Sequence, residues 1–227
     1  MNTAFIPVRG GSKSIPLKNI KLLNGKPLVY WTALAAQNAK CIDKLVIATD
    51  SEEIKSVVMN FGFDKLEIYD RDKSNAEDTS STESVMLEYI SKTNLKNDDL
   101  FLLIQATSPM LKSEHIDGIY NEYINNDSDS MFTGVCEKQF KWLKTEEGLK
   151  PVNYDYRNRP RRQNFEGLIA ENGACYINTV GNIKKDNCRL SGKITSYELP
   201  AYTMYELDEP SDWILVEELM KKLNYDI

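Results

Sequence analysis

Hydrophobic and polar positions along the chain predict strands and helices in turn. Short apolar runs, rich in β-branched residues, predict strands at 4–8, 44–49, 66–69, 101–104, 131–135, 174–178 and 194–197. Apolar residues at helical spacing predict helices at 28–38, after Asp50, at 82–90 and 113–124, with a last helix from Pro210. This alternation is typical of an α/β protein in which helices flank a mostly parallel sheet.

Polar residues refine two helix starts. Asp50 stands before an apolar-periodic segment and Glu53 follows three residues later, which is the pattern of an N-cap with a capping box. Pro210 suits the first turn of the last helix, and Asp208 before it is a candidate cap. Between about 137 and 172 the periodicity weakens while charged and aromatic residues accumulate. We interpret this stretch as an excursion from the main sheet.

Length and composition narrow the class of protein. The chain has 227 residues, 41% hydrophobic and 27% charged, which predicts one globular domain spanning 1–227. A formal net charge of −6 argues against general nucleic-acid binding. No stretch approaches the about 20 apolar residues of a membrane-spanning helix, and no export signal is visible. We therefore expect a cytoplasmic protein with neither nucleic acid nor membrane as a partner.

Cysteine and histidine content excludes several kinds of site. The four cysteines include no C-x-x-C pair and no histidine partner at zinc spacing, so neither a disulfide framework nor a structural zinc site is expected. His115 is the only histidine, which excludes a His-based catalytic triad within this chain. Its polar neighbours favour a place at the surface or at a helix start.

A Gly-rich, basic segment follows the first predicted strand. It is Arg9-Gly10-Gly11-Ser12-Lys13-Ser14-Ile15-Pro16-Leu17-Lys18-Asn19. Glycines let the backbone approach an anion, and three cations within ten positions can neutralise a triphosphate. The glycine spacing matches neither the Walker A nor the dinucleotide-binding pattern. Taken alone, the segment fits a phosphate-binding loop and a solvated surface turn equally well.

Three later segments also suit substrate binding. One is Gln105-Ala106-Thr107-Ser108-Pro109, at the end of a predicted central strand, where open α/β sheets bind ligands; a strand-ending turn is the alternative. Another is Arg159-Pro160-Arg161-Arg162-Gln163, whose guanidinium groups suit phosphate or carboxylate, or form a solvated charged run. In the third, Glu206 and Asp208 are two residues apart, so in an extended segment both side chains point to the same side. They are candidates to hold Mg²⁺ beside a triphosphate, and a helix cap is the alternative role for Asp208.

In order and spacing, these segments resemble the acylneuraminate cytidylyltransferases, also called CMP-sialic acid synthetases. The resemblance covers nearly the whole chain and also includes Arg71 with the Ser/Thr-rich stretch 78–84, the segment 171–173, and 206–213. The sequences of the segments 105–109, 139–142 and 159–163 look closer to the animal type of this enzyme than to many bacterial ones. The resemblance implies a three-layer Rossmann-like nucleotide-sugar transferase fold, a homodimer, and an excursion at 137–172 that exchanges contacts between subunits.

The resemblance also implies roles for individual residues. Those matching catalytic positions are Arg161, Arg9 and Lys18. Those matching nucleotide-binding positions are Arg9, Gly10, Lys13, Asn19, Arg71, Ser80 and Thr82. Those matching sugar-binding positions are Gln105, Arg162, Tyr176 and Lys141, and those matching metal ligands are Asp208 and Glu206. Glu206 stands where the family usually has aspartate, so Asp208 is the firmer candidate for Mg²⁺.

The implied reaction joins CMP from CTP to the anomeric hydroxyl of a sialic-acid-type nonulosonate, such as N-acetylneuraminate, and releases pyrophosphate. Positioning and charge neutralisation would supply most of the catalysis, because no side chain stands out as a general base. Other acidic sugars remain open: deaminated neuraminate, legionaminate, pseudaminate and KDO. A non-catalytic nucleotide-binding protein is the alternative from another class.

Overall fold

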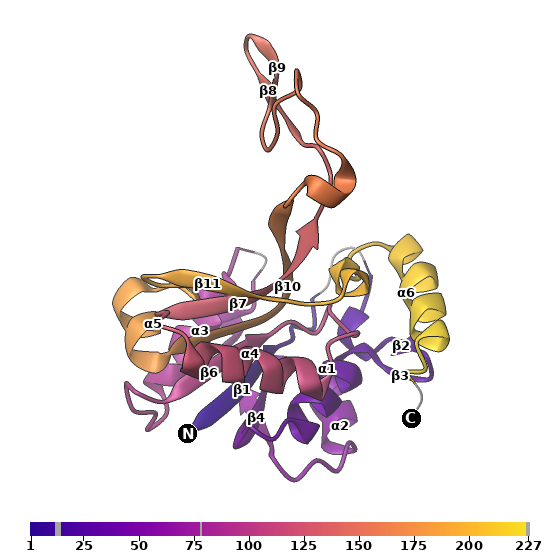
Figure 1. Cartoon of the computed structure of the whole chain (residues 1–227). Coiled ribbons are helices and arrows are strands. Elements are labelled where there is room, and N and C mark those ends of the chain that lie inside the picture. The colour runs from indigo at the N-terminus through magenta and orange to yellow at the C-terminus, as the bar shows by residue number, and fades with distance from the viewer. Residues whose placement is uncertain (12–14, 78, 226–227) are drawn as a thin grey trace.

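The computed structural model describes residues 1–11, 15–77 and 79–225. Within them, a seven-stranded sheet has the order β11-β7-β10-β6-β1-β4-β5 (Figure 1). Its strands are β1 (Asn2–Pro7), β4 (Lys44–Thr49), β5 (Leu66–Asp70), β6 (Leu100–Ile104), β7 (Ser130–Glu137), β10 (Leu168–Thr179) and β11 (Ile194–Glu198). β10 is antiparallel to both of its neighbours, and the other strand pairs are parallel. The mostly parallel sheet predicted from the sequence is confirmed.

Helices cover both faces of the sheet, because successive side chains of a strand point to opposite sides. Helices α1 (Leu28–Asn38), α2 (Glu52–Met59) and α4 (Ser113–Asn125) pack on the face that carries Ala4 and Ile6. Helices α3 (Thr82–Ser91) and α5 (Val180–Asp186) pack on the face that carries Phe5. Helix α6 (Pro210–Lys222) packs near the small hairpin β2 (Leu22–Leu23) and β3 (Lys26–Pro27). The result is the predicted three-layer architecture.

Two helix caps differ from the predictions. Ser51, not Asp50, caps α2, because the Ser51 Oγ accepts the Ile54 N–H at 3.3 Å. Glu209, not Asp208, caps α6, and Asp212 completes the capping box. The Asp212 carboxylate accepts the backbone N–H groups of 208 and 209 at 2.9 and 2.7 Å. Asp50 and Asp208 are therefore not used as caps, and their carboxylates make other contacts.

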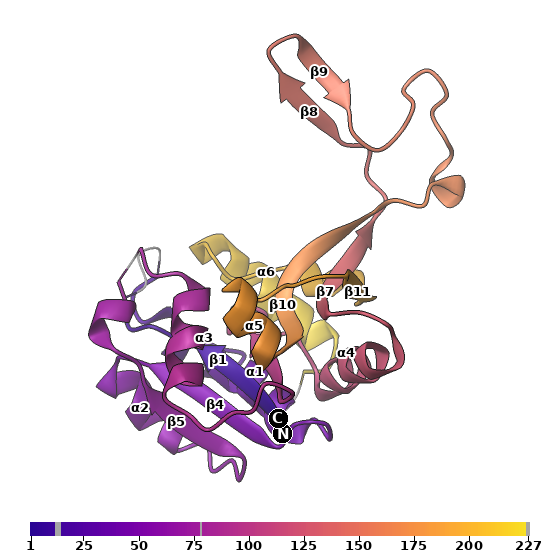
Figure 2. The same ribbon diagram turned by 90° about the vertical axis from the view of Figure 1, so that its left-hand side faces the viewer.

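The chain between β7 and β10 forms an arm that projects far from the body (Figures 1 and 2). It contains the hairpin β8 (Trp142–Thr145) and β9 (Gly148–Pro151) and the 3₁₀ turn η3 (Arg162–Asn164). Aromatic rings pack within the arm, with the Phe140 ring 4.3 Å from that of Tyr154 and 4.9 Å from that of Phe165. The weak periodicity of this stretch has a physical reason: the hairpin presents no face to the main core.

Three smaller expectations were also checked against the fold. His115 lies at the start of α4, where its Nδ1 accepts the Lys112 N–H at 3.2 Å, so the helix-start prediction is confirmed. All four cysteines are unpaired, as predicted. Among the described helices, none has the length and apolar character needed to cross a membrane.

Candidate active site

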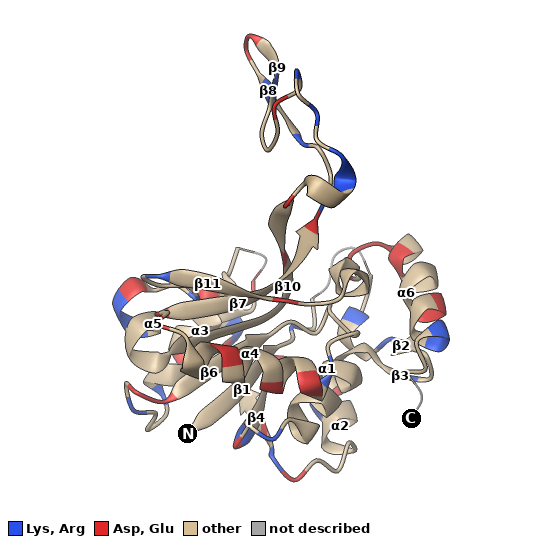
Figure 3. Cartoon of the chain, in the orientation of Figure 1, with Lys and Arg blue, Asp and Glu red and all other residues tan. Residues whose placement is uncertain are grey.

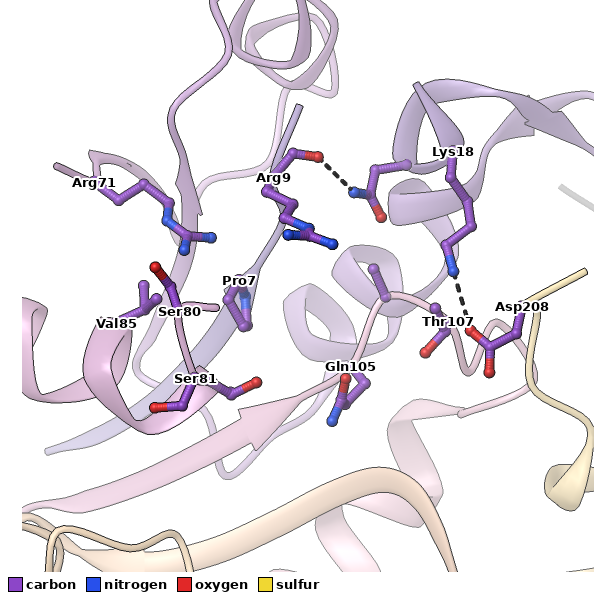
Figure 4. Close-up of a pocket in the computed structure, with 13 residues that line it drawn as sticks. Pro7, Arg9, Lys18, Arg71, Ser80, Ser81, Val85, Gln105, Thr107 and Asp208 are labelled. Carbon is purple, nitrogen blue, oxygen red and sulfur yellow. Dashed lines mark hydrogen bonds and ion pairs between the residues drawn. The ribbon is translucent and has the colours of Figure 1, made fainter. Parts of the chain in front are cut away.

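A cavity of about 450 Å³ lies at the carboxyl edge of the parallel strands. From β1 the chain adds β4 and β5 on one side and β6 on the other, so the strand order reverses beside β1. Open α/β sheets bind ligands at such a switch point. The residues lining the cavity are Pro7, Arg9, Lys18, Asn19, Arg71, Ser80, Ser81, Thr82, Val85, Gln105, Ala106, Thr107 and Asp208 (Figure 4).

Three basic side chains reach this cavity from different elements. Arg9 follows β1, Arg71 follows β5, and Lys18 begins the 3₁₀ turn η1 (Lys18–Ile20). In Figure 4, Arg71 lies on one side, Lys18 on the other, and Arg9 between them. Cations spread in this way suit an extended polyanion, because each can pair with a different phosphate group.

The Gly-rich loop is tied to the body by two hydrogen bonds next to Arg9. The Gly10 N–H donates to Asp50 Oδ1 at 3.1 Å, and Asn19 Nδ2 donates to the Arg9 carbonyl at 3.1 Å. A Cβ on Gly10 would lie 2.9 Å from Ser51 Cβ, so glycine permits the close approach to the start of α2. Gly10 itself does not line the cavity. Lys13 lies outside the described residues.

Lys18 and Asp208 form an ion pair at the far side of the cavity. Lys18 Nζ lies 3.2 Å from Asp208 Oδ1 and donates to the Leu207 carbonyl at 2.8 Å. The Lys18 side chain is 12% exposed, whereas that of Asp208 is 67% exposed. Asp208 therefore keeps much of its carboxylate accessible to a second cation.

The two predicted metal ligands differ in position. Asp208 lines the cavity, and Glu206 does not; its carboxylate lies against Gly173. Burial raises the pKa of Glu206, and repulsion from Asp208 adds to this effect. A bound cation would relieve that repulsion. Mg²⁺ is commonly held by one or two carboxylates together with substrate phosphates. Asp208, which lines the cavity, and the neighbouring Glu206 fit such an ion. No group of three or more metal-ligating side chains occurs among the described residues.

The opposite side of the cavity combines Arg71 with the start of α3. Arg71 is 8% exposed, and its Nη2 donates to the Asn75 carbonyl. Burial lowers the pKa of Arg71, attraction to Asp50 and Glu88 opposes that effect, and repulsion from Arg9 adds to it. Ser80, Ser81 and Thr82 line the adjacent wall. Ser81 caps α3 by accepting the Ser84 N–H at 3.0 Å, so the N-terminus of that helix borders the cavity.

Of the residues predicted to bind sugar, the structure brings Gln105 to the cavity. Tyr176 does not reach it, because β10 turns its ring into the core on the Phe5 face, where it is 3% exposed. The Tyr176 hydroxyl donates to Glu171, and the Arg189 guanidinium lies 5.0 Å from the ring centre. Tyr176 therefore lies outside the cavity of this single chain, and its role in binding the sugar stays a prediction.

Lys141, Arg161 and Arg162 lie on the arm, away from the cavity of the same chain (Figure 3). Lys141 forms an ion pair with Glu137 at the base of the arm. The arginines are exposed, and neither guanidinium has a hydrogen-bond or ion-pair partner within the described ranges. The chain alone thus leaves these three predicted residues apart from the eight predicted residues that line the cavity.

Several residues around the cavity were not predicted. Ser81 and Thr107 line it and belong to segments already singled out, so their polar side chains were the available signal. Pro7 and Val85 carry no such signal, because apolar residues next to strands and in helices are ordinary core positions. Asp50 contacts the loop through Gly10, and its interpretation as a helix cap concealed this contact.

The fold and this site together define a Rossmann-like α/β protein with a basic cavity at the switch point of its sheet. A solved structure of CMP:2-keto-3-deoxy-manno-octonic acid synthetase complexed with CTP shares the fold, with a TM-score of 0.69 at 16% identity over 98% of this chain and 99% of that one. A family model described as cytidylyltransferase matches residues 3–159. The chain belongs to the cytidylyltransferase family.

Two curated relatives match almost the whole chain. An N-acylneuraminate cytidylyltransferase of Oncorhynchus mykiss is 34% identical over 98% of this chain, which corresponds to 51% of the fish protein. A CMP-N,N'-diacetyllegionaminic acid synthase of Legionella pneumophila is 28% identical over 96% of this chain and 95% of its own length. The chain therefore spans about half the length of the animal relative and nearly all of the bacterial one.

Proposed function

We propose that this protein joins CMP from CTP to the anomeric hydroxyl of a sialic-acid-type nonulosonate and releases pyrophosphate. The observation that carries the proposal is the cavity at the switch point, where Arg9, Lys18 and Arg71 converge beside Gln105 in a member of the cytidylyltransferase family. Relatives named for N-acylneuraminate and for N,N'-diacetyllegionaminic acid support a nine-carbon sugar acid as acceptor.

The arrangement suggests how CTP would lie. The cytidine end would contact Arg71 and the wall formed by Ser80 and Thr82, and the phosphates would extend toward Arg9 and Lys18. Gln105, between the two sides in Figure 4, would meet the sugar acid. The sugar hydroxyl oxygen would form a bond to the α-phosphorus, and the bond from that phosphorus to the β-phosphate oxygen would break. Arg9 and Lys18 would offset the charge on the leaving pyrophosphate.

Mg²⁺ is the cofactor we propose, with Asp208 and then Glu206 as its protein ligands. When bound, such an ion supplies charge neutralisation between phosphate oxygens. Lys18 would then serve two partners, because it lies 3.2 Å from Asp208 and faces the cavity. It would hold the carboxylate in place while donating to a phosphate.

Pyrophosphate release tests the activity directly. The protein is incubated with CTP and Mg²⁺ and, in separate reactions, with N-acetylneuraminate, deaminated neuraminate, legionaminate, pseudaminate or KDO. Release with one of the nine-carbon acids alone would support the proposal and identify the acceptor. Preference for KDO would correct the sugar class. CTP binding without release with any acceptor would indicate a non-catalytic nucleotide-binding protein.

We further propose that the protein is a homodimer in which the arm of one subunit completes the cavity of its partner. Arg161, Arg162 and Lys141 are on the arm, where apolar side chains including Trp142 and Leu143 are exposed. Such side chains gain by burial against a second copy. The four unpaired cysteines favour a reducing compartment, and we propose the cytoplasm as the place of action.

A further inference from the structure

Asn75 and Glu88 lie outside the cavity and connect Arg71, on one side of it, to helix α3. Asn75, in the 3₁₀ turn η2 (Lys73–Asn75), accepts Arg71 through its backbone carbonyl. The Asn75 side chain accepts the Ser84 hydroxyl at 2.5 Å and donates to Glu88 Oε2 at 2.7 Å. Ser84 is in the first turn of α3 and Glu88 is one turn further along. Neither Asn75 nor Glu88 lines the cavity.

Glu88 is the anchor of this network. Its Oε1 accepts the Tyr69 hydroxyl at 2.6 Å and the Asp72 N–H at 2.9 Å, and Lys92 lies 3.3 Å away. The side chain is 9% exposed. A largely buried carboxylate with this many donors holds a single orientation, because any rotation would leave donors unpaired. Glu88 thus fixes both the strand end at Tyr69 and the turn that carries Asn75.

The position of the Arg71 guanidinium depends on these contacts, because the side chain is buried and has few other partners. Among the described residues, the guanidinium makes one hydrogen bond, from Nη2 to Asn75, and its Nε has no partner. Arg9 repels it across the cavity, while Asp50 and Glu88 attract it. Because this bond ties the Arg71 guanidinium to the turn η2, its position follows the position of Asn75.

We propose that Glu88 and Asn75 are positioning residues for CTP binding: held against the first turn of α3, they fix Arg71 at the position that the nucleoside end of CTP requires. This inference rests on the proposed function. It predicts that damage to the network weakens CTP binding while leaving the sugar site and the chemical step intact. A purely structural role predicts instead a loss of stability with unchanged CTP affinity.

The test compares Glu88→Gln with the wild type and with Glu67→Gln. Glu67, on β5, also accepts a tyrosine hydroxyl, from Tyr89, and pairs with a lysine, Lys44, but it does not contact Arg71 or Asn75. CTP affinity is measured by calorimetry, and KM and kcat by pyrophosphate release. We expect Glu88→Gln to weaken CTP binding by about tenfold, with kcat at saturating CTP and the KM for sugar within about twofold. Glu67→Gln should match the wild type.

Asn75→Ala is the second variant, because it removes the same link without removing a charge. It keeps the backbone carbonyl that accepts Arg71 and loses the bonds to Ser84 and Glu88. We expect the same selective loss of CTP affinity, smaller than for Glu88→Gln. Circular dichroism and urea unfolding show whether each variant is folded at the assay temperature.

A double-mutant cycle with Arg71→Ala shows whether Glu88 acts through Arg71. If it does, Glu88→Gln weakens CTP binding in the wild type but changes it by less than about twofold when Arg71 is already absent. Equal effects in both backgrounds, or normal CTP affinity in both Glu88→Gln and Asn75→Ala, would overturn the inference. These results are distinct from failure of the proposed function, in which the wild type binds CTP but releases no pyrophosphate with any sugar acid.

Discussion

Single charged residues at this site act mainly through the groups that they hold in place. Lys18 and Asp208 illustrate this, since the nearly buried lysine is held by the Leu207 carbonyl while the exposed aspartate remains open to another cation. Glu88 shows the same principle without touching the cavity. The donors around Glu88 stabilise its ionised carboxylate. The contribution of Glu88 to the stability of the fold should therefore depend on pH.

Glu88 should stabilise the fold at neutral pH and lose that effect in acid. Burial would raise its pKa, but hydrogen bonds from Tyr69, Asn75 and Asp72 outweigh burial and lower the pKa to about 2. A depressed carboxyl pKa stabilises the folded state above the unfolded-state value, near 4.3, and the contribution disappears as pH falls toward 2. We expect Glu88→Gln to reduce the free energy of unfolding by about 2–3 kcal/mol at pH 7.

Urea unfolding of both proteins at several pH values measures this contribution. The difference in unfolding free energy between wild type and Glu88→Gln should narrow steadily from about pH 5 to about pH 2.5, because the unfolded-state carboxyl becomes protonated first. A difference that stays constant over that range would contradict the assignment of the low pKa to Glu88.

Some residues of the cavity could be predicted from the sequence, because their place along the chain was informative. Arg9, Lys18, Asn19 and Gln105 lie in segments that follow predicted strands, and strand ends of a parallel sheet meet at one edge. Asn75 and Glu88 were not predictable in this way, because most of their partners lie 9 to 19 residues away and are set by how α3 packs beside β5. A carboxylate inside an amphipathic helix looks like any solvated position until that packing is known.

Among the elements, the Gly-rich loop is the one whose exact path matters for the site. It passes so close to the start of α2 that a Cβ on Gly10 would lie 2.9 Å from Ser51 Cβ, whereas a Cβ on Gly11 would meet no atom of the described residues within 4 Å. Neither glycine has a positive φ. The two glycines therefore form a matched pair that differs in packing alone.

Gly10→Ala should displace the loop and weaken CTP binding. We expect a loss of about 1–3 kcal/mol in unfolding free energy, typical of overpacking, and a raised KM for CTP, because Arg9 is the adjacent residue. Gly11→Ala should stay within about 0.5 kcal/mol of the wild type and keep its KM. Urea unfolding and pyrophosphate release measure the two effects. Equal behaviour of the two variants would mean that the contact with Ser51 does not constrain the loop.

Element bounds were largely predictable, and the exceptions have physical causes. The helices at 28–38 and 82–91 and the strand at 44–49 follow from periodicity, since each buries one face or both. The cap at 50 was misassigned because neighbouring Ser51 is an equally good cap. The cap at 208 was misassigned because the backbone places Glu209, which is not a preferred cap residue, at the N-cap of α6. The hairpin at 142–151 escaped prediction because it packs on no other element of the sheet.

At the scale of the whole molecule, the separation between the arm and the cavity is the main consequence of the fold. The arm points away from the body (Figure 2). It carries Arg161, while Lys18 lines the cavity. If the proposed homodimer is correct, the two residues of one working site come from different subunits. A mixed dimer can then recover an activity that both parental variants lack.

The variants Arg161→Ala and Lys18→Ala, each with its own affinity tag, test this arrangement. Each homodimer should lose activity by orders of magnitude. A heterodimer purified through both tags has one site in which Arg161 and Lys18 are both intact, so it should regain about half of the wild-type activity if the arm acts across the interface. Sedimentation must show a dimer in each sample. A heterodimer as inactive as its parents would place Arg161 and Lys18 in the same subunit's site, and would require the arm to fold back onto its own cavity.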